Sequence, residues 1–301
     1  MGRLRRMLDR LDRVLELSER TLRQNLREPV RADFFERAQA ARWDTAGGAG
    51  RLVAIDEPAC FDLDDLIGVD PSIERLVRNT EQFLRGHPSN HVLLFGDRGT
   101  GKSSSVKGLL ARFAPRGLRV VEVHKSDLLD LSRVQEALRP LRHGFRFLIF
   151  CDDLSFDLGE PGYRELKAAL EGSLEAPADH VRVVVTSNRR HLIPETMADN
   201  RTARVDDRGD LQIGEVLDEK LALSDRFGLV LGFYAFDQKT YLEVVRHYAR
   251  KAGVELPWEQ IEARALRWSV RRSSRSGRTA RQFVDDLAGG LALDAETGGV
   301  S

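Results

Sequence analysis

The sequence has few cysteines and no long apolar run. Its 301 residues include two cysteines, Cys60 and Cys151, too few for a disulfide framework or a Cys-x-x-Cys metal site. Cys151 lies in an apolar run and is expected to be a buried free thiol, which fits a reducing compartment. No apolar stretch approaches the roughly 18–20 residues that a membrane-spanning helix needs. We therefore expect a soluble, cytoplasmic protein.

The chain also lacks an excess of charge of either sign. Lys and Arg together number 47 and balance 47 Asp and Glu, so the overall charge favours neither nucleic-acid binding nor a membrane surface. The seven histidines show no metal-ligand spacing, and neither GxSxG nor HExxH occurs. Hydrophobic residues make up 42 %, enough for a substantial core in one large domain with a smaller one.

The first 60 residues predict a helical extension. Residues 3–28 show leucines at helical spacing beside charged residues, which is typical of an amphipathic helix. A shorter helix over 32–43, a flexible break over 47–50 and a short strand over 51–55 are expected next. The leucine stripe suits docking to a partner helix or self-association. Packing on the chain's own larger domain, or lying on a lipid surface, remains open.

Residues 61–236 alternate strand and helix patterns. Apolar runs of strand length occupy residues 91–95, 118–123, 145–151, 181–187 and 229–233. Helical patterns cover about 71–86, 102–113, 127–139, 163–174 and 215–224, and a charged stretch over 197–210 is expected to be an exposed insertion. Continuous apolar runs suit strands covered on both faces. The pattern predicts an α/β domain with a five-stranded parallel sheet flanked by helices.

The strand signal ends after residue 236. Helices are expected over 238–251, 257–272 and 278–293, and Asp237 suits the N-cap of the first. Residues 237–301 therefore predict a small all-helical domain.

The segment GDRGTGKS, residues 96–103, carries the strongest functional signal. It matches the P-loop pattern G-x-x-x-x-G-K-[ST] and lies between a predicted strand and a helix that begins at Lys102. Its glycines let successive backbone N–H groups point at phosphate oxygens, and the helix N-terminus adds partial positive charge. Lys102 would reach the β and γ phosphates, and Ser103 would ligate Mg²⁺. The residues that we expect to bind nucleotide here are Gly96, Asp97, Arg98, Gly99, Thr100, Gly101, Lys102, Ser103 and Ser104. A Gly-rich turn without a ligand is the alternative.

Two carboxylates, Asp152 and Asp153, follow the predicted strand over 145–151. In P-loop proteins an Asp at this position helps to hold the metal, so Asp152 and Ser103 are the predicted Mg²⁺ ligands. Asp153 would orient the attacking water. The alternative is a pair of acids that cap a strand in solvent.

Further segments resemble the AAA+ ATPase superfamily, from about Phe61 to about Leu293. They are DLIG (65–68), VVVTSN (183–188), SDRFG (224–228) and TAR (279–281). Other strings resemble, more narrowly, a bacterial AAA+ family known as domain of unknown function 815: NTEQFLRG (79–86), CDDLSF (151–156), TSNRRHLIPE (186–195) and SDRFGLVLGF (224–233). That resemblance implies an ATPase without a named substrate.

The superfamily resemblance implies roles for single residues. Ile67 and Gly68 would pack by the adenine, and Asn188 would be the polar tip of the sensor-1 strand. Arg226 would be an arginine finger that enters a neighbour's active site, with a surface salt bridge as the alternative. Arg281 would reach the γ-phosphate from a helical lid. The superfamily often has Glu where this chain has Asp153, so hydrolysis is expected to be slow or to need repositioning by a partner.

Together these residues predict ATP and Mg²⁺ as cofactors. Lys102, the metal and Arg281 would neutralise charge on the γ-phosphate, while Asn188 and Asp153 position the water. Arg226 would add charge across a subunit interface. A lone subunit should then be nearly inactive, and ATP should favour a ring or helical homo-oligomer.

Three functions follow from this reading. The first is an AAA+ ATPase that hydrolyses ATP at subunit interfaces to remodel or load an unidentified macromolecule, with residues 1–45 binding a protein partner. The second is a DNA-linked loader, with nucleic acid bound by the seven arginines of residues 264–281. The third is a nucleotide-gated scaffold with little hydrolysis. A small-molecule kinase fits less well, because it would leave Arg226 and Arg281 without a role.

Arg189 and Arg190, which follow Asn188, have two open interpretations. They contact nucleotide or a neighbouring subunit, or they are solvated loop charges.

Overall fold

The structure of the protein is a computed structural model. It describes residues 33–46, 48, 50–141, 144–156, 160–171, 178–190 and 225–298, with the single residues and pairs 13, 30, 192, 204–205, 211–212 and 223. The predicted helix over 3–28, the insertion over 197–210 and the helix over 215–224 therefore lie largely or wholly outside the described residues.

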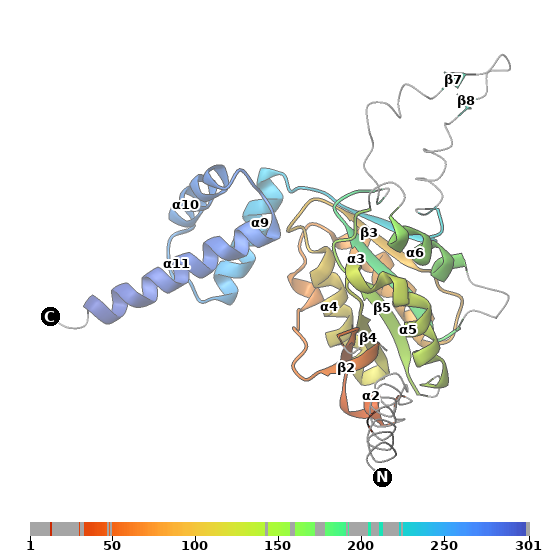
Figure 1. The fold of residues 1–301 in the computed structure, drawn as a ribbon. Helices are drawn as coiled ribbons and strands as arrows, with labels where there is room; N and C mark the ends of the chain where they lie inside the picture. Colours follow the sequence, from red (N-terminus) through yellow and green to blue (C-terminus); the bar gives the residue numbers. More distant parts are fainter. Residues whose placement is uncertain are drawn as a thin grey trace, which may run out of the picture.

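A sheet forms the middle layer of the part of the molecule on the right of Figure 1. It has seven strands in the order β2-β1-β4-β5-β6-β3-β9. Its strands are β1 (Ala40–Asp44), β2 (Arg51–Ile55), β3 (Val92–Gly96), β4 (Leu118–Glu122), β5 (Arg146–Cys151), β6 (Val181–Ser187) and β9 (Leu229–Phe233). All neighbours pair in parallel except β1 with β2, which are antiparallel. The two-residue strands β7 (Arg204–Val205) and β8 (Leu211–Gln212) form a separate antiparallel pair.

The prediction of five strands was wrong, because β1 and β2 extend the sheet to seven. The short strand over 51–55 is confirmed as β2. The helix expected over 32–43 shrinks to α2 (Phe34–Arg37), and its second half is β1. Alanine-rich sequence favours a helix locally. Here pairing of Ala40 with Val120 of β4 and with Ile55 of β2 overrides that preference.

Helices cover both faces of the sheet. One face carries α3 (Asp70–Leu84) and α4 (Lys102–Phe113), and the other carries α5 (Leu131–Leu138), α6 (Pro161–Glu171) and α2. Short 3₁₀ turns occur at η1 (Leu63–Asp65), η2 (Ala114–Arg116), η3 (Lys125–Asp130) and η4 (Arg139–Leu141). Because strand side chains alternate between faces, neighbouring residues such as Val120 and Val121 belong to different cores. Packing in these two cores holds the strands in place, including the ends of β3 and β5 at the carboxyl edge of the sheet.

Three helices follow the sheet: α9 (Gln238–Lys251), α10 (Trp258–Arg271) and α11 (Gly277–Gly298). We call them the helical unit, which lies beside the sheet in Figure 1. The predicted N-cap is confirmed, since the Asp237 side chain accepts the Thr240 N–H at 2.7 Å. Apolar residues of α9 and α11 join the same core as α3 and α4, so the unit packs against the α/β part of the chain.

His91 makes stability depend on pH. It precedes β3, and its Nδ1 accepts the Val183 N–H at 2.9 Å. Burial, aided by the positive charge of Arg182, lowers the pKa of His91 from 6.5 to about 4. The unfolded chain therefore binds more protons between these values, and stability is full above pH 6.5 and falls as the pH drops towards 4. We expect this one group to cost about 2–3 kcal/mol by pH 4.5, measured by urea unfolding.

The matched control is His91→Asn, whose side-chain oxygen can accept the same N–H without titrating. Its stability should fall less than that of the wild type between pH 7 and pH 4.5. Equal losses in the two proteins would contradict the assignment to His91.

Candidate functional site

The predicted phosphate loop joins β3 to α4 at the carboxyl edge of the sheet. Gly96, Gly99 and Gly101 have φ angles of +131°, +77° and +109°, which side chains rarely allow. A Cβ on Gly96 would also lie 1.9 Å from the Phe233 carbonyl oxygen, and one on Gly101 would lie 2.6 Å from Leu66. The strand-loop-helix context predicted from the sequence is confirmed.

Lys102 folds back onto this loop. Its Nζ donates to the carbonyl oxygens of Gly96 and Asp97, both at 2.7 Å, and to Asn188 Oδ1 at 3.2 Å. Burial lowers the pKa of Lys102, and the carboxylates of Asp153, Asp97 and Asp152 oppose that effect. The ammonium is thus buried, charged and held by neutral oxygens that a phosphate could replace.

Ser103 and Asp152 meet at the end of β5. Ser103 Oγ donates to Asp152 Oδ1 at 2.6 Å, and Thr186 Oγ1 donates to the same oxygen. A hydroxyl and a carboxylate are the hard oxygen ligands that Mg²⁺ prefers, and phosphates and water usually complete its shell. The two residues predicted to bind the metal are therefore adjacent and chemically suited to it.

Asp153 has an unusual backbone conformation. Its φ is +50°, a left-handed value that Asp and Asn tolerate better than other non-glycine residues. Its N–H donates to Thr186 Oγ1 at 2.8 Å, and its side chain accepts a hydrogen bond from Asn188 Nδ2. Asn188 thus bridges Lys102 and Asp153. Asp153 also lines the same cavity as the phosphate loop.

A cavity of about 670 Å³ lies between the loop and the helical unit. Polar and charged groups of its lining come from the loop, Arg98 to Ser104, and from Asp152, Asp153 and Asn188. Apolar side chains also line it: Phe61, Leu66, Ile67, Phe236, Val244 and Tyr248. A lining with both kinds of group suits a ligand that carries phosphates and a flat ring.

The helical unit reaches this cavity from α11. Arg278 and Arg281 both line it. The Arg278 N–H donates to the Gly99 carbonyl oxygen at 3.1 Å, so the main chain of α11 is bonded to the phosphate loop. Arg281 lies 5.9 Å from the centre of the Tyr248 ring and 3.9 Å from Asp285.

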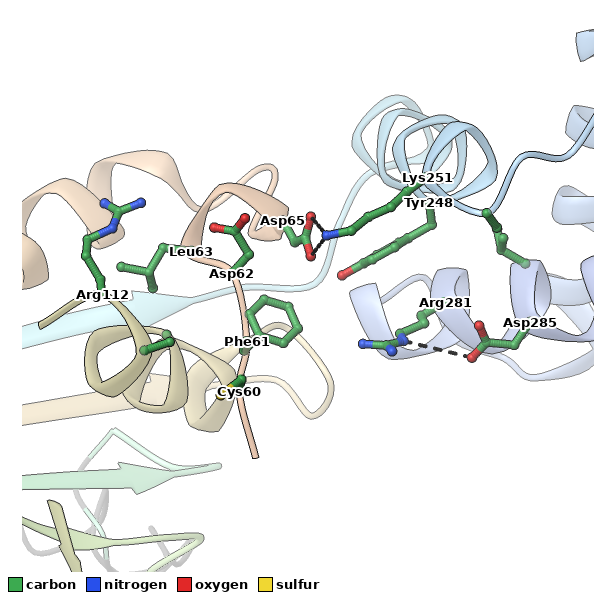
Figure 2. A pocket seen from close by; sticks show the side chains of 14 residues that line it. Cys60, Phe61, Asp62, Leu63, Asp65, Arg112, Tyr248, Lys251, Arg281 and Asp285 are labelled. Carbon is green, nitrogen blue, oxygen red and sulfur yellow. Dashed lines mark hydrogen bonds and ion pairs between the residues drawn. The ribbon is translucent and has the colours of Figure 1, made fainter. Parts of the chain in front are cut away.

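A second cavity of about 660 Å³ adjoins the first (Figure 2). The two share the lining residues Cys60, Phe61, Asp65, Tyr248 and Arg281. Across it, Lys251 Nζ contacts both oxygens of Asp65, at 2.6 and 2.8 Å, and His247 Nε2 lies 2.8 Å from one of them. Burial alone would raise the pKa of Asp65, but these bonds outweigh it and lower the pKa. These contacts join α9 to η1, whose residue Asp65 lines both cavities.

Four predicted site residues lie away from the cavity lining. The Asp97 carboxylate accepts the N–H of Ala235, two residues after the end of β9, at 2.7 Å, and Gly96 packs against Phe233. Gly68 lies against Thr240 of α9. Arg226 precedes β9 and lies at the opposite, amino edge of the sheet. The other predicted residues, Ile67, Arg98–Ser104, Asp152, Asp153, Asn188 and Arg281, come together at the cavity.

Two residues of the site were missed from the sequence. Thr186 was detectable, because strand pairing places the end of β6 beside the end of β5. Arg278 had no signal that separated it from the other arginines of its segment. Among the described residues, no cluster of three or more His, Cys, Asp or Glu could hold a metal by itself, and no helix has both the length and the apolarity to cross a membrane.

Comparison with known proteins identifies the fold and the family. Thermotoga maritima RuvB, a Holliday junction branch migration motor, superposes with a TM-score of 0.51 at 19 % identity, covering 77 % of this chain and 65 % of that one. A variant of RuvB gives a TM-score of 0.52 at 18 % identity, covering 77 % and 66 %. The chain thus spans just under two thirds of the RuvB length, and identity this low shows the fold alone. The model of the family described as protein of unknown function (DUF815) matches residues 36–291. The chain therefore belongs to the DUF815 family, and its fold is similar to that of RuvB.

Proposed function

We propose that the protein is an AAA+ ATPase that binds and hydrolyses Mg²⁺-ATP at the interfaces between its own subunits. The observation that carries this proposal is the hydrogen-bonded chain from Lys102 through Asn188 to Asp153, beside the Ser103–Asp152 pair. These contacts support the proposal because they bring together the residues that we propose as the phosphate-binding cation, the polar bridge, the base and the metal ligands.

The triphosphate would lie along the loop from Arg98 to Ser104, and the ring would pack against apolar side chains of the cavity lining. Bound Mg²⁺, held by Ser103 and Asp152, would neutralise charge on the phosphates. Lys102 would exchange its two carbonyl partners for phosphate oxygens. Asp153, held by Asn188, would accept the proton of the attacking water. Arg281 would approach from the helical unit, which then acts as a lid.

Arg226 supports hydrolysis between subunits. It lies three residues before the start of β9 at Leu229, whereas the phosphate loop follows the far end of the adjacent parallel strand β3. Five residues of strand span about 16 Å, which is beyond the reach of an arginine side chain. Arg226 cannot serve its own loop, so we place it in the site of a neighbouring copy.

The energy would serve to remodel or load a macromolecular partner. We propose that a protein partner binds within residues 1–45, ahead of β1, because β1 is paired on both sides within the sheet. RuvB, which has a similar fold, is a motor that acts on Holliday junctions. By analogy, we propose mechanical work on a macromolecule as the output of ATP hydrolysis here.

Calorimetry and turnover test the proposal. Wild-type protein should bind Mg²⁺-ATP and release phosphate steadily at high protein concentration. Lys102→Ala removes the charge-assisted hydrogen bonds to phosphate, so binding should weaken about 10- to 100-fold. Turnover should be lost with it.

Lys239→Ala is the matched control, because Lys239 is an exposed lysine of α9 outside both cavities. It should bind and turn over ATP like the wild type. No heat of binding in the wild type would refute the proposal. Binding without turnover at any protein concentration would leave a nucleotide-gated scaffold in its place.

A further inference from the structure

Seven arginines and no acidic residue occupy positions 264–281, and all seven are exposed. Elsewhere in the described chain many arginines pair with carboxylates, as do Arg37, Arg51, Arg112, Arg116, Arg133 and Arg146. Within 264–281 only Arg281 has such a partner among the described residues. Although the net charge of the chain is zero, positive charge without nearby carboxylates is concentrated in residues 264–281.

Three of these arginines form a line along α10. The helix packs through Ile261, Ala265 and Ser269. At about 100° per residue, Arg264, Arg267 and Arg271 fall within an arc of about 60° on one flank of the solvent side. The acids of α10, Glu259 and Glu262, fall on the opposite flank. We call Arg264, Arg267 and Arg271 the α10 stripe, and Figure 1 shows α10 on the outside of the helical unit, away from the sheet.

We propose that the α10 stripe binds the phosphate backbone of nucleic acid. The three guanidinium groups are spread over about 10 Å of helix axis, a length along which duplex DNA carries about six charges. Arginine forks pair well with phosphate oxygens, and each pair releases counterions from the nucleic acid. Neighbouring Arg272 and Arg275 are also exposed and extend the positive field.

The composition of this flank favours a polyanion over a folded protein. Protein interfaces centre on buried aromatic and apolar anchors, and charged residues are depleted there. The tryptophan of α10 nearest the stripe, Trp268, is not available as an anchor, because its ring packs against Phe283 and under Arg272. For the same reason the flank offers no ring on which a base could stack. Binding should therefore be independent of sequence and equal for duplexes of different composition.

The stripe is also connected to the phosphate loop. In the turn after α10, the Arg275 carbonyl oxygen accepts the Phe236 N–H at 3.2 Å. In α11, the Arg278 N–H donates to the Gly99 carbonyl oxygen of the phosphate loop. Nucleic acid on α10 would thus lie next to a turn and a helix that are hydrogen-bonded to residues of the cavity lining. The binding itself does not require ATP hydrolysis, so its test is independent of the proposed function.

The test is fluorescence anisotropy with a short labelled DNA duplex of random sequence and the full chain without nucleotide. Wild-type affinity should fall steeply between about 50 and about 200 mM salt. The triple variant Arg264→Gln, Arg267→Gln, Arg271→Gln keeps good helix formers on α10. It should bind about tenfold or more weakly, with a salt slope shallower by about three.

The matched control is Arg51→Gln, Arg116→Gln, Arg133→Gln, which changes net charge equally but removes paired arginines. It should bind like the wild type, and melting curves check that both variants fold. The proposal is wrong if the wild type does not bind the duplex at about 50 mM salt. It is also wrong if both triple variants lose affinity equally, or if polyglutamate displaces the duplex as well as unlabelled DNA does.

Discussion

Arg226→Ala should lower kcat for ATP hydrolysis by about 10³–10⁵ while leaving ATP binding nearly unchanged. An arginine finger contributes charge to the transition state, when negative charge spreads over the γ-phosphoryl oxygens, and contributes little to the bound ground state. Because Arg226 lies at the amino edge of the sheet, the loss would come from the neighbour's site. Phosphate release and calorimetry on the same sample measure the two effects. Arg133→Ala, a surface arginine paired with Asp130, is the control.

Mixing two inactive variants separates an interface role from one within the subunit. Arg226→Ala keeps Asp153, and Asp153→Asn keeps Arg226. In a mixed oligomer at equal amounts, about a quarter of interfaces combine an intact Asp153 with an intact Arg226 from the adjoining copy. Activity should return to about that fraction. No recovery, in a mixture shown to co-assemble, would rule out Arg226 as a residue that acts between copies.

Asp153→Asn should lower kcat by about 10²–10⁴ and trap ATP in the site. The substitution removes the proton acceptor and little else. Asn tolerates the left-handed φ of +50°, and the new side-chain oxygen can still accept the hydrogen bond from Asn188. Nucleotide retention after gel filtration and single-turnover hydrolysis measure the two outcomes.

Asp153→Glu provides the comparison, because many superfamily members have Glu at this position. A longer side chain is less suited to the left-handed conformation, and it would displace Asn188 from its bridge to Lys102. We expect it to be less active than the wild type. Full activity of Asp153→Asn would show that another group activates the water.

The central strands could be predicted from the sequence because each is a continuous apolar run. β1 could not, since Ala40, Ala41 and Arg42 carry no strand signal of their own. They form a strand only because β4 and β2 supply partners on both sides. The Asp237 cap was predictable for the opposite reason, because a cap depends only on neighbours in the chain.

The candidate site likewise has features that the sequence predicted and features that it did not. The loop and both carboxylates were found by their spacing, and the structure brings them together at one cavity. The backbone turn of Asp153 and the bond from Arg278 to Gly99 depend on how distant segments pack, so spacing did not reveal them. The catalytic roles of Asp153 and Arg226 are the predictions that the experiments above test.

The strand pair β1–β2 also affects how the protein can be shortened. β4 is almost wholly buried, and β1 covers the side that would otherwise be the margin of the sheet. A truncated chain that began at Phe61, where the recognisable motifs start, would leave the N–H and C=O groups along that side of β4 unpaired. Uncovered strand edges recruit other strands, so such a fragment should aggregate even with an intact nucleotide site. Truncations should therefore keep residue 33 onwards.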